Sequence, residues 1–79
     1  MRKTLQKHHK QFLKRLGENI RQIRKQRGYS METFANEAEI EYRQIGRIER
    51  GEINTTIGIL LRLSEVLEVE ITEFFKIIN

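Results

Sequence analysis

Cysteine and proline are both absent from this chain of 79 residues. Without cysteine there is neither a disulfide framework nor a thiolate metal site, so packing, helped by self-association, must stabilise a domain of this size. Without proline, helix ends have to be inferred from apolar periodicity, caps and glycines. We expect one compact domain, because so short a chain cannot bury two separate cores.

Long apolar runs are also missing. The longest covers residues 57–61, is interrupted by Gly58, and falls short of the roughly 18 apolar residues of a membrane span. The N-terminal sequence MRKTLQKHHK lacks the apolar stretch of a secretory signal. These features predict a cytoplasmic protein with no membrane partner.

The residues needed for catalysis are scarce. Catalysis requires a convergent set of nucleophile, base and orienting group, and the chain offers only the adjacent His8 and His9 in a basic segment. No carboxylate or cysteine stands near them at metal-ligand spacing. We therefore expect no enzyme activity, no metal site and no cofactor.

Positive charge is concentrated at one end of the chain. Residues 1–27 hold ten Lys or Arg and one acid, a net charge of +9, whereas residues 28–79 hold five bases and ten acids, a net charge of −5. This asymmetry favours a basic segment that faces nucleic acid and an acidic remainder kept away from it. A basic helix that is merely solvated is the alternative interpretation.

Apolar spacing predicts a first helix that ends near Gly28. Residues at intervals of four, four and three share one face of it: Phe12, Leu16, Ile20 and Ile23. The same stripe continues back to Leu5. Residues 1–11 are therefore either a basic N-terminal arm or an extension of this helix, and residues 12–79 form the domain.

A second helix is predicted over residues 31–38. Ser30 is suited to cap it, and Tyr29 and Phe34 occupy the two positions of a hydrophobic staple. The chain then turns through residues 39–40 into the next helix.

A third helix is predicted over residues 42–50. It buries Ile45 and Ile48, and Gly51 ends it, because glycine readily takes the left-handed conformation.

A fourth helix, capped by Thr55 or Thr56, carries the most apolar segment of the chain. A fifth short helix is predicted over residues 69–78. No strand is expected. Five helices joined by tight turns make an all-α domain.

Two short helices joined by a turn of three or four residues form the unit that places its second helix in the DNA major groove. From Gly28 to Gly51 the chain reads GYSMETFANEAEIEYRQIGRIERG. This string resembles the Cro/C1-type (XRE-like) helix-turn-helix family of phage repressors and bacterial regulators, and the resemblance covers about residues 12–75. The residues in register with the family pattern are Arg24, Gly28, Ser30, Phe34, Ala35, Ala38, Ile40, Ile45, Ile48, Glu49 and Gly51.

The resemblance implies a compact five-helix fold of the lambda-repressor type that binds double-stranded operator DNA sequence-specifically, as a homodimer, and regulates transcription. In length and layout the chain also looks like the controller proteins of restriction-modification systems, a subgroup that binds operators as dimers. The helix over residues 42–50 is then the recognition helix. Its positions that contact base edges in the family are Tyr42, Arg43, Gln44 and Arg47.

Further roles follow from the same resemblance. The positions that contact phosphate in the family are Ser30, Met31, Arg50, Asn54, Thr55 and Thr56. Met31 stands where the family often has a glutamine, so a polar contact is lost there. Arg24 and Glu49 match the pair that joins the first helix to the end of the third as a partly buried salt bridge.

The chain departs from the family pattern at three other positions. Glu39 and Glu68 stand where the family usually has glycine. We expect a left-handed backbone at both, at a cost of roughly 1 kcal/mol each. Gly46 replaces a small polar residue, which lowers helix propensity but allows a close approach to the turn or to DNA.

The C-terminal segment is more apolar than packing on one side requires. We expect a two-fold dimer through the fifth helix, with half-sites about 34 Å apart or at a related spacing. The residues predicted for this interface are Ile71, Phe74, Phe75, Ile77 and Ile78.

A second class of function remains open at this point. The scaffold is also compatible with a protein-binding module, such as an antitoxin or anti-repressor, that uses the acidic half of the chain. In activators of this family the second helix touches the RNA polymerase sigma subunit. By that analogy Glu32 is a candidate for an activating surface.

Overall fold

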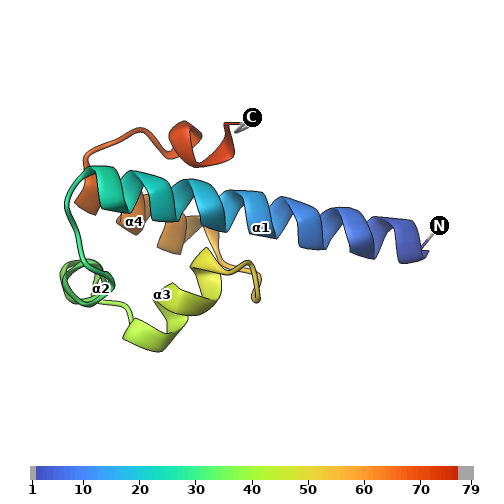
Figure 1. The fold of residues 1–79 in the computed structure, drawn as a ribbon, viewed down its shortest axis with the longest axis horizontal. Helices are drawn as coiled ribbons and strands as arrows, with labels where there is room; N and C mark the ends of the chain where they lie inside the picture. The colour runs from blue at the N-terminus through green and yellow to red at the C-terminus, as the bar shows by residue number, and fades with distance from the viewer. Residues whose placement is uncertain (1, 77–79) are drawn as a thin grey trace.

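The computed structural model describes residues 2–76, with side chains described from residue 8 onward, and over this range all regular secondary structure is helical. The elements are α1 (Arg2–Gln26), α2 (Met31–Ala38), α3 (Tyr42–Glu49), α4 (Ile57–Leu67) and a 3-10 helix, η1 (Ile71–Phe75) (Figure 1). The all-α architecture is confirmed. The count of five holds only with η1 included, because the last element is a 3-10 helix and not an α-helix.

Helix α1 runs along the longest dimension of the molecule, with α2 and α3 on one side of it and η1 on the other (Figure 1). Helix α4 closes the core by packing against α2 and η1. All five elements contribute buried residues to one apolar cluster: Leu16, Ile20, Phe34, Ala35, Ala38, Ile40, Ile45, Ile48, Leu60, Leu63, Leu67 and Phe74. Within the described part of the chain, no helix has both the length and the apolar character needed to cross a membrane.

The N-terminal half of α1 projects beyond this core (Figure 1). The helix has 25 residues, which makes it about 37 Å long at 1.5 Å per residue. Residues 2–11 are continuous with the rest of α1. Phe12, predicted to share the apolar face of this helix with Leu16 and Ile20, is not part of the core: it is 52% exposed. Its ring stacks on that of Phe75, with centroids 6.1 Å apart.

The predicted starts of α2 and α4 are confirmed by their caps. Ser30 Oγ accepts a hydrogen bond from the backbone N–H of Thr33 at 3.1 Å, and the rings of Tyr29 and Phe34 lie 6.2 Å apart, as a hydrophobic staple requires. At α4 the cap is Thr56, whose Oγ1 accepts from Ile59 N at 3.1 Å. Local capping chemistry thus defines where α2 and α4 begin.

Glu39 and Glu68 both adopt the expected left-handed conformation, each with φ of 57°. Glu39 ends α2 and opens the three-residue turn to α3. The guanidinium of Arg62, on α4, donates from Nη1 to the carbonyl oxygens of Ala38 (3.1 Å) and Glu39 (3.2 Å). Helix α4 therefore holds the turn between α2 and α3, a role that the sequence pattern did not reveal.

The C-terminal segment corrects part of the predicted dimer interface. Phe74 is fully buried in the core of its own chain, so it is not available to a second copy. Asn19 fixes this segment to α1: its Nδ2 donates to the carbonyl oxygens of Phe74 (2.8 Å) and Lys76 (2.5 Å). Ile71 is half-buried and Phe75 is exposed. Ile77 and Ile78 lie outside the described residues.

Candidate nucleic-acid interface

The two faces of α3 have opposite environments. The inner face buries Ile45 and Ile48 in the core, where they are 1% and 3% exposed. The outer face carries the residues predicted to contact bases, all exposed except the half-buried Gln44: Tyr42, Arg43, Gln44 and Arg47. This separation follows from the helical period, which places residues three and four apart on the same side.

Arg43 and Arg47 lie one turn apart on the exposed face. The ion pairs found among residues 8–76 do not include either of them. A guanidinium presents parallel N–H donors that match the O6 and N7 acceptors of guanine in the major groove. The outer face of α3 therefore presents two side chains of the type that reads base edges.

A buried ion pair determines where α3 lies. Arg24, on α1, contacts Glu49 at the end of α3 through two hydrogen bonds, Nε to Oε2 at 2.6 Å and Nη2 to Oε1 at 3.1 Å. Both side chains are almost completely buried, at 7% and 4% exposure. Arg24 Nη1 also donates to the carbonyl oxygen of Tyr29 at 2.8 Å. One side chain thus joins α1, α3 and the loop that precedes α2.

Gly17 allows α1 and α3 to approach closely enough for this pair to form. A Cβ atom at Gly17 would lie 2.3 Å from the carbonyl oxygen of Ile48 and 2.5 Å from that of Glu49, so the two backbones are in direct contact. Sequence reasoning assigned no role to Gly17. The only signal was a glycine inside a strongly helical stretch, which weakens a helix unless something requires it.

The predicted phosphate-contacting residues fall into two groups. Ser30 and Met31 lie at the start of α2, and the rest lie on or beside the loop between α3 and α4: Arg50, Asn54, Thr55 and Thr56. Helix N-termini carry free N–H groups and a partial positive charge, which suit an anion. Thr55 Oγ1, however, is buried and has no hydrogen-bond partner among the described residues. We therefore remove the Thr55 hydroxyl from the proposed phosphate set.

Arg50 is exposed and pairs with Glu52 in the same loop, with Nε 2.7 Å from Oε2. The hydrogen bond from Arg50 is the main cause that lowers the pKa of Glu52; desolvation opposes it, and the charges of Arg50 and Arg47 add to it. The pKa of Arg50 is correspondingly raised. Exposed pairs of this kind are weak, so a phosphate can compete with Glu52 for Arg50.

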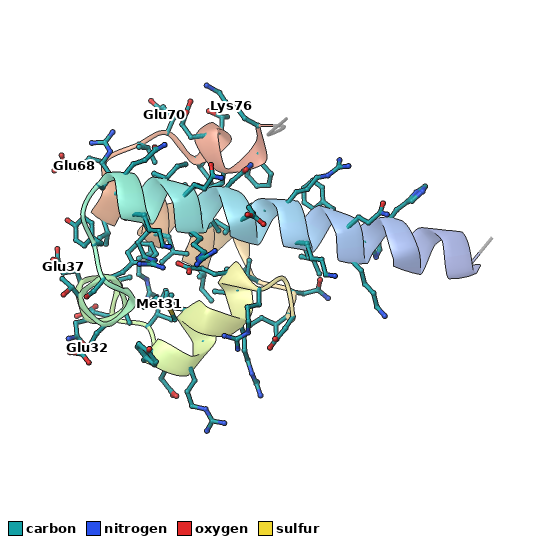
Figure 2. All side chains as sticks on the ribbon, viewed as in Figure 1. Met31, Glu32, Glu37, Glu68, Glu70 and Lys76 are labelled. Carbon is teal, nitrogen blue, oxygen red and sulfur yellow. The ribbon has the colours of Figure 1, made fainter. Side chains whose placement is uncertain are left out.

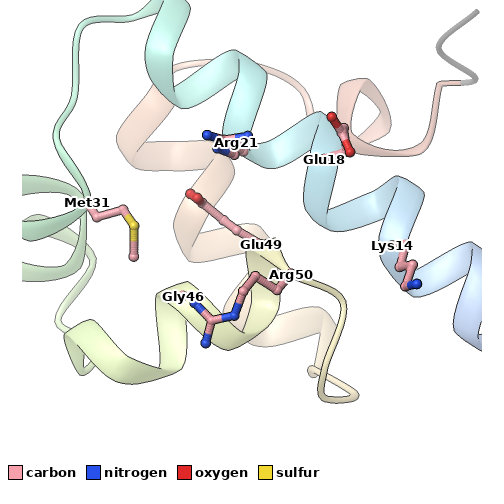
Figure 3. Close-up of a pocket in the computed structure, with 7 residues that line it drawn as sticks. All are labelled: Lys14, Glu18, Arg21, Met31, Gly46, Glu49 and Arg50. Carbon is pink, nitrogen blue, oxygen red and sulfur yellow. The ribbon is translucent and has the colours of Figure 1, made fainter.

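Met31 and Gly46, which both depart from the family pattern, lie next to each other. A Cβ at Gly46 would lie 3.3 Å from Met31 Cε and 3.0 Å from Arg50 Nη1. Figure 3 shows the cleft that these residues share, with Lys14, Glu18 and Arg21 on the α1 side and Gly46 and Arg50 on the α3 side. The absence of a side chain at Gly46 leaves room for Met31.

Four acidic residues lie at the end of the molecule opposite the projecting part of α1. Figure 2 shows Glu32 and Glu37 on α2, and Glu68 and Glu70 after α4, at this end. The charge asymmetry of the sequence is only partly an asymmetry in space, because Lys25 lies in the last turn of α1 and Glu18 and Glu52 lie beside Lys14.

A three-residue turn between α2 and α3, with the second helix exposed along its outer face, defines a helix-turn-helix protein. A family model described as "Helix-turn-helix" (HTH_3) matches residues 20–74. The chain belongs to this family.

Curated relatives carry names of transcriptional regulators. The chain is 39% identical over 61 residues to the HTH-type transcriptional regulator SlrR of Bacillus subtilis, a match that covers 76% of this chain and 40% of that protein. It is 36% identical over 59 residues to the HTH-type transcriptional regulator RamB of Mycobacterium tuberculosis, covering 75% of this chain and 12% of that protein. The match thus spans less than half the length of these relatives.

Solved structures share the fold. The restriction-modification controller protein C.AhdI from Aeromonas hydrophila superposes with a TM-score of 0.78 at 32% identity, covering 80% of this chain and 96% of that one. An HTH_3 family transcriptional regulator from Vibrio cholerae superposes with a TM-score of 0.79 at 30% identity, covering 85% of this chain and 38% of that one. The DNA-binding domain of BldD superposes with a TM-score of 0.77 at 26% identity, covering 85% of this chain and 97% of that one.

The Arg24–Glu49 pair should contribute strongly to the stability of the fold. Glu49→Ala should lower the free energy of unfolding by about 3–5 kcal/mol, because it leaves Arg24 buried without its partner. Urea denaturation followed by circular dichroism measures this change. Glu52→Ala, which breaks the exposed pair with Arg50, is the control and should hardly change the urea concentration at the midpoint of unfolding. Equal effects of the two substitutions would show that the buried pair does not hold α3.

Proposed function

We propose that this protein binds double-stranded DNA sequence-specifically as a homodimer, with α3 in the major groove, and thereby regulates transcription. The observation that carries the proposal is the outer face of α3, where Arg43 and Arg47 are exposed on a helix whose inner face is buried. A rigid support matters because base readout requires donors held at fixed positions. Helix α3 is supported by the core on its inner face and by the Arg24–Glu49 pair at its end.

Phosphate contacts would fix the orientation of α3 in the groove. The starts of α2 and α4 both offer free backbone N–H groups, and Ser30, Arg50, Asn54 and Thr56 are exposed beside them. Such contacts position a protein on the duplex without specifying its sequence. Met31 contributes no polar group, so at the start of α2 we assign the phosphate to backbone N–H groups and Ser30.

We expect substitutions on α3 to reduce sequence preference more than general affinity. On a duplex selected from random sequences by the wild-type protein, Arg43→Ala and Arg47→Ala should each weaken the free energy of binding by about 1–3 kcal/mol. Each should also relax the preference at one base pair per half-site. Binding to unrelated duplexes should change much less. Fluorescence anisotropy at one fixed salt concentration measures both.

Arg15→Ala is the matched control for these variants, because Arg15 is exposed on the η1 side of α1. An equal loss with Arg15→Ala, or an equal loss on every duplex, would contradict base readout by α3. A wild-type chain that selects no duplex at all would favour the alternative function, a protein-binding module such as an antitoxin or anti-repressor.

We place the dimer interface at the C-terminal segment. One recognition helix reads only one half-site, so a two-fold dimer is needed to read a symmetric operator. After the removal of Phe74, the described apolar surface there consists of Ile71, Phe75 and the neighbouring Phe12, which stacks on Phe75. Ile57 and Leu61, exposed on α4, form a second apolar surface.

Sedimentation of single variants tests this interface. The wild-type protein should sediment as a dimer at micromolar concentration, and Phe75→Glu should sediment as a monomer, because it buries a charge in the interface. Asn36→Glu, on the exposed surface of α2, is the control and should remain dimeric. A monomeric wild type would contradict dimerisation. Dissociation by Ile57→Glu alone would place the interface on α4 instead.

The contact with the RNA polymerase sigma subunit stays a proposal for Glu32. This residue is exposed in the first turn of α2, where an acid also stabilises the helix dipole. Glu32→Lys should lower output from an activated promoter at saturating protein concentration, where DNA occupancy is not limiting. Unchanged output would leave Glu32 with the helix-stabilising role alone.

A narrower form of the proposal is a restriction-modification controller, which the likeness to C.AhdI supports. A selected operator that lies upstream of a restriction or controller gene would establish it, and one found only elsewhere would exclude it.

A further inference from the structure

We propose that one basic edge of α1, formed by Lys10, Lys14 and Arg21, binds the phosphate backbone of the DNA that flanks each half-site. The proposal rests on the DNA binding proposed above and adds a second contact surface, carried by a helix that base readout does not use. It does not depend on residues 1–7.

The three side chains share one edge of the helix. Their spacings of four and seven residues place them on the same side of α1, and all three are exposed. Gly17 lies on this edge as well, and its backbone contacts the end of α3. The basic edge therefore borders the recognition helix.

The first half of this edge faces the loop between α3 and α4. Lys10 and Lys14, with His9 and Leu13, line one side of a cleft whose other side is formed by Arg50, Gly51, Glu52 and Asn54. The loop and the helix are in backbone contact here, because a Cβ at Gly51 would lie 2.7 Å from the Cα of Lys14. The two lysines are thus held beside Asn54, a proposed phosphate contact.

The second half of the edge continues past α3. Lys14 and Arg21 line the cleft drawn in Figure 3, opposite Gly46 and Arg50. Lys14 lines both clefts, so they follow one another along α1. Lys10 and Arg21 are 11 residues apart, which corresponds to about 16 Å along the helix axis.

Bases outnumber unpaired acids along this edge of α1. Two of the carboxylates that line the clefts are already paired, Glu49 with Arg24 and Glu52 with Arg50. The remaining acid is Glu18, against Lys10, Lys14 and Arg21. The ion pairs within the described range do not involve these three bases. Positive charges spread over this length match a polyanion with regularly spaced phosphates better than a single small anion.

Arg15, on a neighbouring side of α1, provides an internal comparison. Arg15 is adjacent to Lys14 and shares a shallow cleft with it, but it lines neither of the two clefts that face α3 and the α3–α4 loop. It also lines a cleft with Phe12 and Phe75. It therefore has the same charge on the same helix, on the side that faces η1. A general effect of charge and a directed contact with phosphate can be separated by comparing these two positions.

The test is the salt dependence of binding by the full chain to a selected operator with long flanks. The wild type, the double variant Lys10→Gln/Lys14→Gln and Arg15→Gln are compared over a series of KCl concentrations. Each neutralised phosphate makes the slope of log K against log salt more negative by about 0.9, so the slope of the double variant should be less negative than that of the wild type by about 2. Arg15→Gln should leave it unchanged. On a duplex trimmed to the two half-sites, the double variant and the wild type should bind alike.

Each result decides between specific alternatives. An unchanged slope in the double variant, with thermal melting showing a folded protein, would overturn the contact while leaving the proposed function intact. A slope made equally less negative by Arg15→Gln would also overturn the proposed contact, since that result would show a general effect of charge. If the wild type prefers no duplex, the proposed function itself fails, and this contact fails with it.

Discussion

The buried pair of Arg24 and Glu49 is the interaction on which the rest of the structure depends. Two opposite charges taken out of water must stay together, because either one alone is costly to bury. Their contact sets the position of α3 against α1, and the bond from Arg24 to the Tyr29 carbonyl adds the start of α2 to the same arrangement. The outer face of α3 is directed outward because its other face and its end are held in this way.

Two further polar side chains hold segments of the fold together. Arg62 joins α4 to the turn at Glu39. The backbone of Glu39 is left-handed, which costs a modest amount of free energy in any residue other than glycine. Asn19 joins α1 to Phe74, within η1, and to Lys76, directly after it. Each of these side chains bonds backbone carbonyls of a segment distant in sequence. The two eight-residue helices, α2 and α3, are too short to be stable alone, and the Arg62 contact with the turn between them is one of the tertiary contacts that hold them.

Much of this fold could be predicted from local chemistry. The bounds of α2 and the caps at Ser30 and Thr56 depend on neighbouring residues, which the sequence displays directly. The left-handed Glu39 and Glu68 were expected from the family resemblance, because both stand where the family usually has glycine. The roles of Gly17, Asn19 and Arg62 depend on which segments meet, and no local pattern carries that information. The exposure of Phe12, the burial of Phe74 and the hidden Thr55 hydroxyl were missed for the same reason. Of the candidate site, the outer face of α3 was predictable because helical periodicity separates it from Ile45 and Ile48, and the family resemblance implied that its residues contact base edges. The basic edge of α1 required the position of the α3–α4 loop.

The central claim is that Tyr42, Arg43 and Arg47 meet base edges in the major groove, and methylation interference on a selected operator tests it most directly. Guanine N7 lies in the major groove and adenine N3 in the minor groove, so methylation at the two atoms distinguishes the grooves. The account predicts that N7 methylation of guanines within each half-site blocks binding, while N3 methylation there has little effect. Interference confined to adenine N3, or to neither atom, would contradict it.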